Sequence, residues 1–334
     1  MNSTDIIWHP ALLNSNTAAN NGGGMNRAAV IANDTKNNLL PNVSQTERTN
    51  GVTRNRKAFV HVAPTVNTDL LNVKVFIDKV TPGDDYVLLK TGTFVDKESD
   101  AAMSRPYGIA ILNTAASASD TTVVVRCENA AGYTSLTPFR SGDTVRIANR
   151  DVMGSDGNEE YKVIDTVTYG QNTTSIALTT ALAHSYPTET TCVSSVYMID
   201  TITPLNTTPV TTSSAGVFAN TLGLSHAGTP NAAWTLTFTT TTAYTLNAII
   251  DGVSSNWTGN TSATLTATAT VGGATKTLLS LPSSLFSGTW AQGDTVTFST
   301  TPAAIPLWVT QIVPAATGSL SNDYCSIAVL GETA

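Results

Sequence analysis

The sequence predicts an all-β protein built from several modules, with a β-sandwich and a small β-barrel behind a long extended N-terminal arm. Charged residues make up 12% of the chain, about half the usual share, whereas hydrophobic residues at 41% are enough for a core. Residues 201–334 contain 31 Thr and 14 Ser, and β-branched Thr favours strands over helices. Apolar and polar residues also alternate with a period of two in many short segments, as they do in half-buried strands.

Residues 1–56 are interpreted as an extended arm that docks on its own domain or on a neighbouring chain. The segment is rich in Asn, Gly and Ala, and its GGGM run is typical of a flexible turn rather than of a regular element. Apolar residues such as Trp8 recur within it, which a plain linker would not carry. Ser44, followed three residues later by Glu47, predicts a capping box at the start of a short helix.

Residues 57–114 are predicted to form an anchoring β-sheet domain. The segments KAFVHVA and NVKVFIDK alternate between apolar and polar residues, and a turn signal, TPGDD, precedes DYVLLKTGTFVD. The final strand-like segment, YCSIAVLG, has few neighbours in the sequence with which it could pair. Residues 315–334 are therefore expected to complete this first sheet.

Residues 115–200 are predicted to form a small β-barrel module. Its strand-like segments are TTVVVRC, SGDTVRIANR, EYKVIDTVTYG, TSIALTTAL and CVSSVYMID. Asp143 and Asn149 lie where the turns between such strands favour Asx side chains. Turn-rich stretches between short alternating segments are typical of this architecture.

Residues 201–314 are predicted to form an immunoglobulin-like β-sandwich module. The expected strands are WTLTFTT, AYTLNAII, SATLTATATV, TKTLLSL and GDTVTFSTT, and DGVSSNWTGN is interpreted as a turn between two of them. Large residues, among them Trp234, Trp257 and Trp308, are enough to fill one core.

The charge distribution argues against direct nucleic-acid readout. The formal net charge is -7, and Lys276 is the only cation among residues 201–334. A nucleic-acid binder needs a basic face that neutralises phosphates. The single basic cluster consists of Arg48, Arg54, Arg56 and Lys57. We interpret it as a solvated loop or as a set of ion pairs with an acidic neighbour.

The lack of targeting signals and the pattern of the cysteines predict synthesis in a cytoplasm without export. No window holds 18 consecutive apolar residues, so no membrane span is expected, and MNSTDIIWHPALL lacks the features of a secretory signal. No Cys-x-x-Cys pair supports a zinc site. Cys127 and Cys192 lie at the ends of strand-like segments, so a disulfide between them is geometrically allowed. Buried free thiols, Cys325 included, are the alternative that we favour.

The remaining polar residues supply no catalytic or metal motif. His9, His61, His184 and His226 lie in unrelated contexts without metal-ligand spacing. No Gly-x-Ser-x-Gly elbow is present, and GGGM is neither a phosphate-binding nor a dinucleotide-binding loop.

Three carboxylate pairs have the composition that sugar-cleaving enzymes need. They are Asp84–Asp85, Glu98–Asp100 and Glu159–Glu160. All lie in turn-rich stretches, and adjacent strand residues point to opposite faces, so solvated turns are expected. Residues 151–160 supply oxygen ligands without the spacing of a calcium loop. We therefore predict no catalytic residue, no metal and no cofactor, and we do not expect an enzyme.

Residues 20–63 and 72–100 resemble the amino-terminal half of structural proteins of tailed-bacteriophage virions. The similar features are the Asn-Gly-Gly stretch, the NNLLPNV turn, the RKAF strand entry and the FID…TPGDD hairpin. The terminal SNDYCSIAVLGE is similar as well. The resemblance implies a non-enzymatic particle component, and the two inner modules resemble the immunoglobulin-like and barrel insertions of phage proteins.

The expected function is that of a virion structural subunit, assembled in the host cytoplasm as a ring or collar at the head–tail junction. Its expected partners are copies of itself and neighbouring portal, connector, tail or baseplate proteins. The alternative is a baseplate or receptor-binding adhesin subunit, in which Trp257 or Tyr169 would stack on a host surface glycan. A polysaccharide-degrading enzyme on a β scaffold is a third, less favoured hypothesis.

Overall fold

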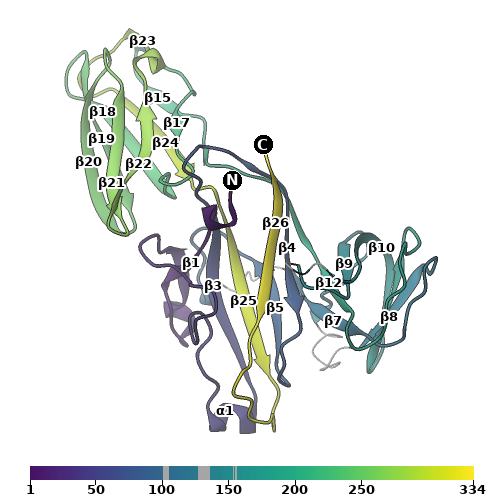
Figure 1. Ribbon diagram of the computed structural model, residues 1–334. Coiled ribbons are helices and arrows are strands. Elements are labelled where there is room, and N and C mark those ends of the chain that lie inside the picture. The colour runs from purple at the N-terminus through teal and green to yellow at the C-terminus, as the bar shows by residue number, and fades with distance from the viewer. Residues whose placement is uncertain (101–104, 127–135, 153, 155) are drawn as a thin grey trace.

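Antiparallel strands dominate the chain. The computed structural model describes residues 1–100, 105–126, 136–152, 154 and 156–334. Strands account for 51% of it, which confirms the mostly-β prediction. Figure 1 shows a central body between a barrel on one side and a second, Thr-rich module on the other. In the described part of the chain, no helix is long and apolar enough to cross a membrane.

The central body begins with a six-stranded sheet of order β2-β1-β3-β25-β5-β6. Its strands are, in that order, β2 (Gly22–Met25), β1 (Ile6–Leu13), β3 (Val52–Val62), β25 (Ala304–Val313), β5 (Tyr86–Thr91) and β6 (Pro106–Tyr107). A second sheet of order β13-β4-β26 consists of β13 (Tyr197–Ile202), β4 (Leu70–Lys79) and β26 (Ser326–Thr333). Side chains of both sheets, such as Val60, Val75 and Leu307, form one buried core.

The structure shows no long extended arm at residues 1–56. The segment docks on its own domain, one of the two expected alternatives, and it does so as strands. β1 pairs with β3 from Ile6 opposite Val62 to Pro10 opposite Ala58, and β2 pairs with β1. The GGGM run forms β2 instead of a flexible turn, because it pairs with β1. Gly22 at its start also lies close to the indole of Trp308. The composition concealed these strands, since their partners lie far away in the sequence.

The last two strands of the chain both return to the central body. β26 pairs with β4, with Val329 opposite Val75. β25 lies between β3 and β5, so residues 304–313 and Trp308 belong to the central sheet and not to the sandwich core. Most residues of β25 are buried, and the sequence offered no local evidence of which sheet they enter.

The barrel is closed by six strands in the order β10-β11-β8-β7-β12-β9. The strands are β7 (Ile109–Leu112), β8 (Thr122–Arg126), β9 (Thr144–Ala148), β10 (Glu159–Tyr169), β11 (Thr173–Leu178) and β12 (Cys192–Ser195). Alternate residues, such as Val123, Val125 and Ile176, point into its core. The segment CVSSVYMID is divided, because β12 closes the barrel whereas β13 pairs with β4.

The Thr-rich module has one large sheet and two smaller ones around a shared core. The large sheet has the order β14-β24-β18-β19-β20, and β15 also pairs with β24. Its strands are β14 (Leu205–Asn206), β15 (Val210–Thr212), β18 (Ala232–Phe238), β19 (Ala243–Ile250), β20 (Val253–Asn260) and β24 (Thr295–Thr301). The smaller sheets comprise β17 (Gly223–Leu224), β21 (Leu265–Val271) and β22 (Ala274–Leu281), and the pair β16 (Ala215–Phe218) and β23 (Phe286–Thr289). Their shared core includes Trp234, Leu246 and Leu279.

Helical structure in the described residues is limited to short pieces. The one α-helix there, α1 (Gln45–Asn50), begins with the predicted capping box. The Ser44 amide donates to a carboxylate oxygen of Glu47 at 2.8 Å, and the Glu47 amide donates to the Ser44 hydroxyl at 3.3 Å. The 3-10 turns are η1 (Ser3–Asp5), η2 (Ala18–Asn20), η3 (Glu98–Asp100) and η4 (Ser283–Leu285).

Candidate functional site

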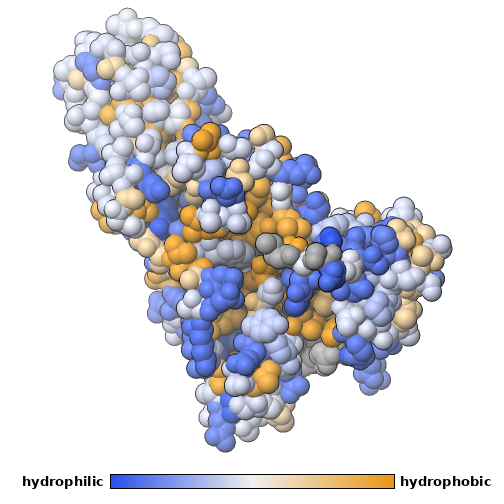
Figure 2. Space-filling model, viewed as in Figure 1, coloured by the Kyte–Doolittle hydropathy of each residue, from blue (hydrophilic) through white to orange (hydrophobic). Residues whose placement is uncertain are grey.

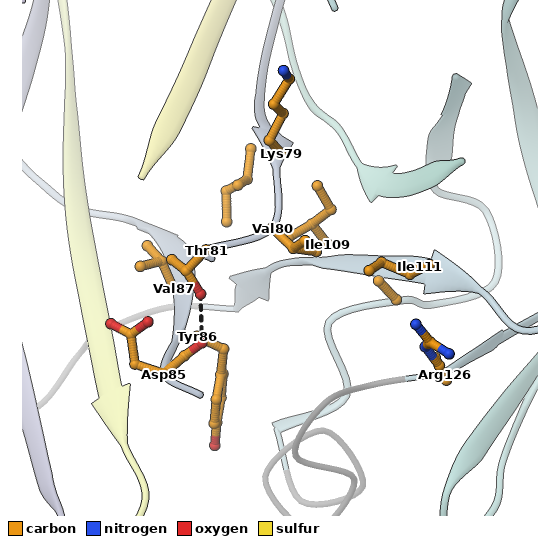
Figure 3. A pocket seen from close by; sticks show the side chains of 11 residues that line it. Lys79, Val80, Thr81, Asp85, Tyr86, Val87, Ile109, Ile111 and Arg126 are labelled. Carbon is orange, nitrogen blue, oxygen red and sulfur yellow. Dashed lines mark hydrogen bonds between the residues drawn. The ribbon is translucent and has the colours of Figure 1, made fainter. Parts of the chain in front are cut away.

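A small cavity lies between the central sheets and the barrel, and Figure 3 shows its lining. Its volume of about 20 Å³ holds about one water molecule. The Thr81 hydroxyl donates to the backbone carbonyl of Asp85 at 2.5 Å, which closes one side. The two cationic side chains at its rim form ion pairs outside the cavity. Lys79 pairs with Asp151, and Arg126 pairs with Glu189 of the barrel. This cavity is too small for an organic substrate.

The carboxylates proposed for acid–base or calcium chemistry are engaged in structural contacts. Glu159 binds Arg146 and Arg150, whereas Glu160 pairs with Lys162 on the other side of the strand. Of the calcium-loop candidates, residues 153 and 155 lie outside the described residues. Within the described part of the chain, no three His, Cys, Asp or Glu side chains converge in a way that could hold a metal ion.

The other two carboxylate pairs are engaged in the same way. Asp85 accepts from the Gln311 amide at 2.6 Å, and Asp84 accepts from a backbone amide of the segment before β26. Glu98 accepts from Asn21 and Asn55, each at 2.7 Å. These side chains fasten loops to the central body and do not face one another across a cleft.

The basic cluster of the sequence fixes the N-terminal segment and the loop after β5. Its four members point to acidic side chains or to backbone carbonyls. The partners are Glu47 for Arg54, Asp96 for Lys57, the Ser15 carbonyl for Arg56 and the Val43 carbonyl for Arg48. Arg54, Arg56 and Lys57 are buried, so they present no basic face.

The described cysteines are free thiols. Cys192 lies in β12 and Cys325 just before β26, and neither forms a disulfide. Cys127, the other half of the disulfide considered above, lies outside the described residues. Burial raises the pKa of the Cys192 thiol, so this side chain stays protonated near neutral pH.

The two aromatic residues considered for glycan stacking pack within their own modules. Trp257 stacks at a tilt on Trp234, with ring centroids 5.6 Å apart, and its indole donates to the Thr268 carbonyl. Tyr169 packs against the barrel core, and its hydroxyl both donates to the Phe139 carbonyl and accepts from the Phe139 amide.

Three of the four histidines meet where the central body joins the Thr-rich module. His9 of β1, His61 of β3 and His226 of the loop between β17 and β18 are 4%, 4% and 5% exposed. Nδ1 of His61 lies 3.2 Å from Nε2 of His9, and Nε2 of His61 lies 2.7 Å from the His226 carbonyl oxygen. Sequence reasoning missed this cluster, because no spacing pattern links the three positions; His184 lies apart, on the barrel.

Further polar contacts cross the same junction. Arg27 donates to the Gly228 carbonyl at 2.9 Å and forms a salt bridge of 2.9 Å with Asp251. Nε2 of His226 lies 2.9 Å from an Asp69 carboxylate oxygen. Asn67 accepts from the His226 amide at 3.1 Å. This group of side chains, which we call the histidine junction, links β1, β3 and the segment before β4 to the Thr-rich module.

The large sheet of the Thr-rich module presents an outward face without charge. Cross-strand registers place five exposed residues in one row across five strands: Val210, Thr297, Thr235, Asn247 and Asn256. A neighbouring row contains Thr212, Thr295, Thr237, Thr245 and Thr258. We call these two rows the Thr/Asn face. On the side seen in Figure 2, the Thr-rich module is largely white, which is the intermediate hydropathy of Thr.

Comparisons with protein-family models, with curated proteins and with solved structures found no match to this chain.

Proposed function

We propose that the chain is a structural subunit of a tailed-phage virion, which assembles through protein–protein contacts as a ring or collar at the head–tail junction. The observation that carries an assembly role is the Thr/Asn face. Its outward rows contain only Thr, Asn and Val, without one ionisable side chain.

Such a face suits burial against another protein. Charged groups must lose their hydration when an interface forms, and that loss often exceeds the gain from pairing. The buried centre of protein interfaces is accordingly depleted in charge. Thr and Asn side chains supply hydrogen bonds in register across strands about 4.8 Å apart, so a partner surface with the same spacing would match them.

The location of the phage-like segments supports the assignment to a virion. Residues 20–63 and 72–100 contribute β2, β3, β4 and β5, and the similar terminal segment contributes β26. All five strands belong to the two sheets of the central body. The resemblance therefore covers one physical unit, which we propose as the anchor, with the other two modules projecting from it.

The adhesin alternative depends on Trp257 and Tyr169. Since both side chains are engaged within their own modules, no observation favours a glycan site, and we retain the assembly role.

Mass measurement of the purified full-length chain tests the proposal. We expect a closed oligomer at micromolar concentration. The double variant Thr235→Lys/Asn247→Lys, which puts two like charges on the Thr/Asn face, should shift the population to monomers. Thr168→Lys, at an exposed position of barrel strand β10, is the matched control and should assemble like the wild type.

Electron microscopy of particles that contain the labelled chain tests the proposed position at the head–tail junction. Density for the label at a ring between head and tail would support the collar. A chain that stays monomeric at all concentrations and is absent from particles would overturn the proposal. If the double variant and the control assemble equally well, the Thr/Asn face is not the surface through which the subunits contact one another.

A further inference from the structure

The histidine junction has a hydrogen-bonding conflict at its centre. A carbonyl oxygen can only accept, so Nε2 of His61 must donate to His226, and Nδ1 of His9 must donate to the Ala29 carbonyl at 2.6 Å. A neutral imidazole carries one proton. The two nitrogens that face each other at 3.2 Å, Nδ1 of His61 and Nε2 of His9, are therefore both bare when the rings are neutral.

Proton uptake at this pair is limited. One added proton would lie between the two rings, but a second would leave two N–H groups pointing at each other. The surroundings add further positive charge from Arg27, which bridges to the Thr-rich module. The anionic groups, Asp251 and Asp69, are already engaged by Arg27 and His226.

Burial opposes the charged form of both rings as well. It lowers the pKa of His61 to about 4, with a further contribution from the nearby positive charge of His9 and Arg27. Burial also lowers the pKa of His9. In a solvated chain both imidazoles would accept a proton near pH 6.5, so acid favours any state in which the two rings leave the junction.

We propose that the histidine junction is a proton-operated latch, which holds the Thr-rich module against the central body near neutral pH and releases it on acidification. The contacts across it connect side chains of the central body to a loop at residues 224–228 and to the turn at Asp251. When both His9 and His61 are charged, two N–H groups point at each other across 3.2 Å, so the rings must move apart. The contact of His61 with the His226 carbonyl is lost with that movement, and the module separates as a unit.

The barrel is joined to the central body by a different kind of contact. Arg146 of the barrel is fully buried. Its Nη1 lies 2.9 Å from Oδ1 of Asp78 in β4, and its Nε lies 2.6 Å from Oε1 of Glu159. The guanidinium keeps its charge across this pH range. The contact contains no histidine, so the barrel serves as the internal reference for a change that depends on His9 and His61.

Amide hydrogen exchange and small-angle scattering of the full-length protein between pH 7.5 and 4.5 test the latch. After correction for the intrinsic effect of pH, exchange at residues 224–228 should accelerate by up to about tenfold per pH unit for each proton taken up. The radius of gyration should rise over the same range, and barrel amides should stay protected. Unchanged protection at residues 224–228 down to pH 4.5 would overturn the proposal.

The double variant His9→Gln/His61→Gln replaces both rings by side chains that still donate to the carbonyls but do not titrate. It should remain closed at pH 4.5, whereas His184→Gln should open like the wild type. Opening of the double variant at the wild-type pH would contradict the latch. If the double variant does not fold, the imidazole resonances of the wild type test the proposal. His9 and His61 must not both become charged before exchange accelerates, and protonation of both rings in a closed molecule would refute the proposal.

Discussion

A Cβ atom on Gly22 would lie 2.7 Å from Cη2 of Trp308, so the backbone of β2 touches an indole that belongs to the other end of the chain. The same indole donates to Asp96 at 2.8 Å, and Asp96 binds the buried amine of Lys57 at 2.6 Å. The N-terminal segment is thus fastened to β3 and β25 by one contiguous set of contacts.

Gly22→Ala should therefore destabilise the protein by about 1–3 kcal/mol, through the left-handed φ of +105° and the contact with Trp308. Chemical denaturation would measure the free energy of unfolding. Gly293→Ala is the matched control, because Gly293 has a φ of +93° but open space around it. It should cost only about 1 kcal/mol, and equal losses would show that the contact with Trp308 is unimportant.

Arg146→Met should cost about 3–5 kcal/mol, because it leaves the buried Asp78 without this guanidinium and removes one of the two arginines that bind Glu159. Lys79→Gln removes an ion pair whose side chains are 40% and 53% exposed. It should change the free energy of unfolding by no more than about 1 kcal/mol. Urea denaturation of both variants tests the difference; similar losses would contradict the role assigned to burial.

The stability of the protein should depend on the protonation of Asp323 between about pH 4 and pH 6. Burial and the neighbouring Asp85 raise the pKa of Asp323 to about 6 from an unfolded value of 3.8. The folded state then binds more protons than the unfolded state between these values, so stability is full below pH 3.8 and falls as pH rises through 6. Asp323→Asn should gain about 1 kcal/mol at pH 8, after allowance for solvent screening, and nothing at pH 3.5.

Thermal or urea unfolding at several pH values would measure this profile. Asp156→Asn, at an exposed position of the barrel, provides the reference for losing one negative charge. A gain for Asp323→Asn that is equal at pH 3.5 and pH 8 would rule out the linkage to proton binding.

The alternation of β18 predicts opposite outcomes at two adjacent residues. Trp234 is 1% exposed in the module core, whereas Thr235 is on the Thr/Asn face. Trp234→Ala should cost about 3–5 kcal/mol, and Thr235→Lys should stay within about 0.5 kcal/mol. Differential scanning calorimetry tests both. A large loss for Thr235→Lys would mean that this face is already covered within the monomer.

Strand positions were predictable where the pattern was local. Val123 and Val125 alternate with exposed or half-buried residues in β8, and the Ser44–Glu47 box began α1 as expected. β20 was interpreted as a turn because VSSNWTGN is polar, yet it pairs with β19 along its full length. A half-exposed strand needs few apolar residues once a neighbour supplies its hydrogen bonds.

The candidate site was hidden for a related reason. His9, His61 and His226 are distant in the sequence, and each by itself is a single polar residue in an unremarkable segment. Their meeting depends on the β1–β3 pairing and on the return of a loop from another module. The Thr/Asn face was implied by the composition, but its two rows follow only from the strand registers.

The sequence by itself determined that this chain forms strands, because stiff β-branched residues and a period of two are local properties. The tertiary structure alone decided which strands are neighbours: β1 against β3, β25 between β3 and β5, and β13 on β4. Backbone hydrogen bonds are the same for every residue except Pro, so the choice of partner depends on side-chain packing between distant segments, and that information is not contained in any one of them.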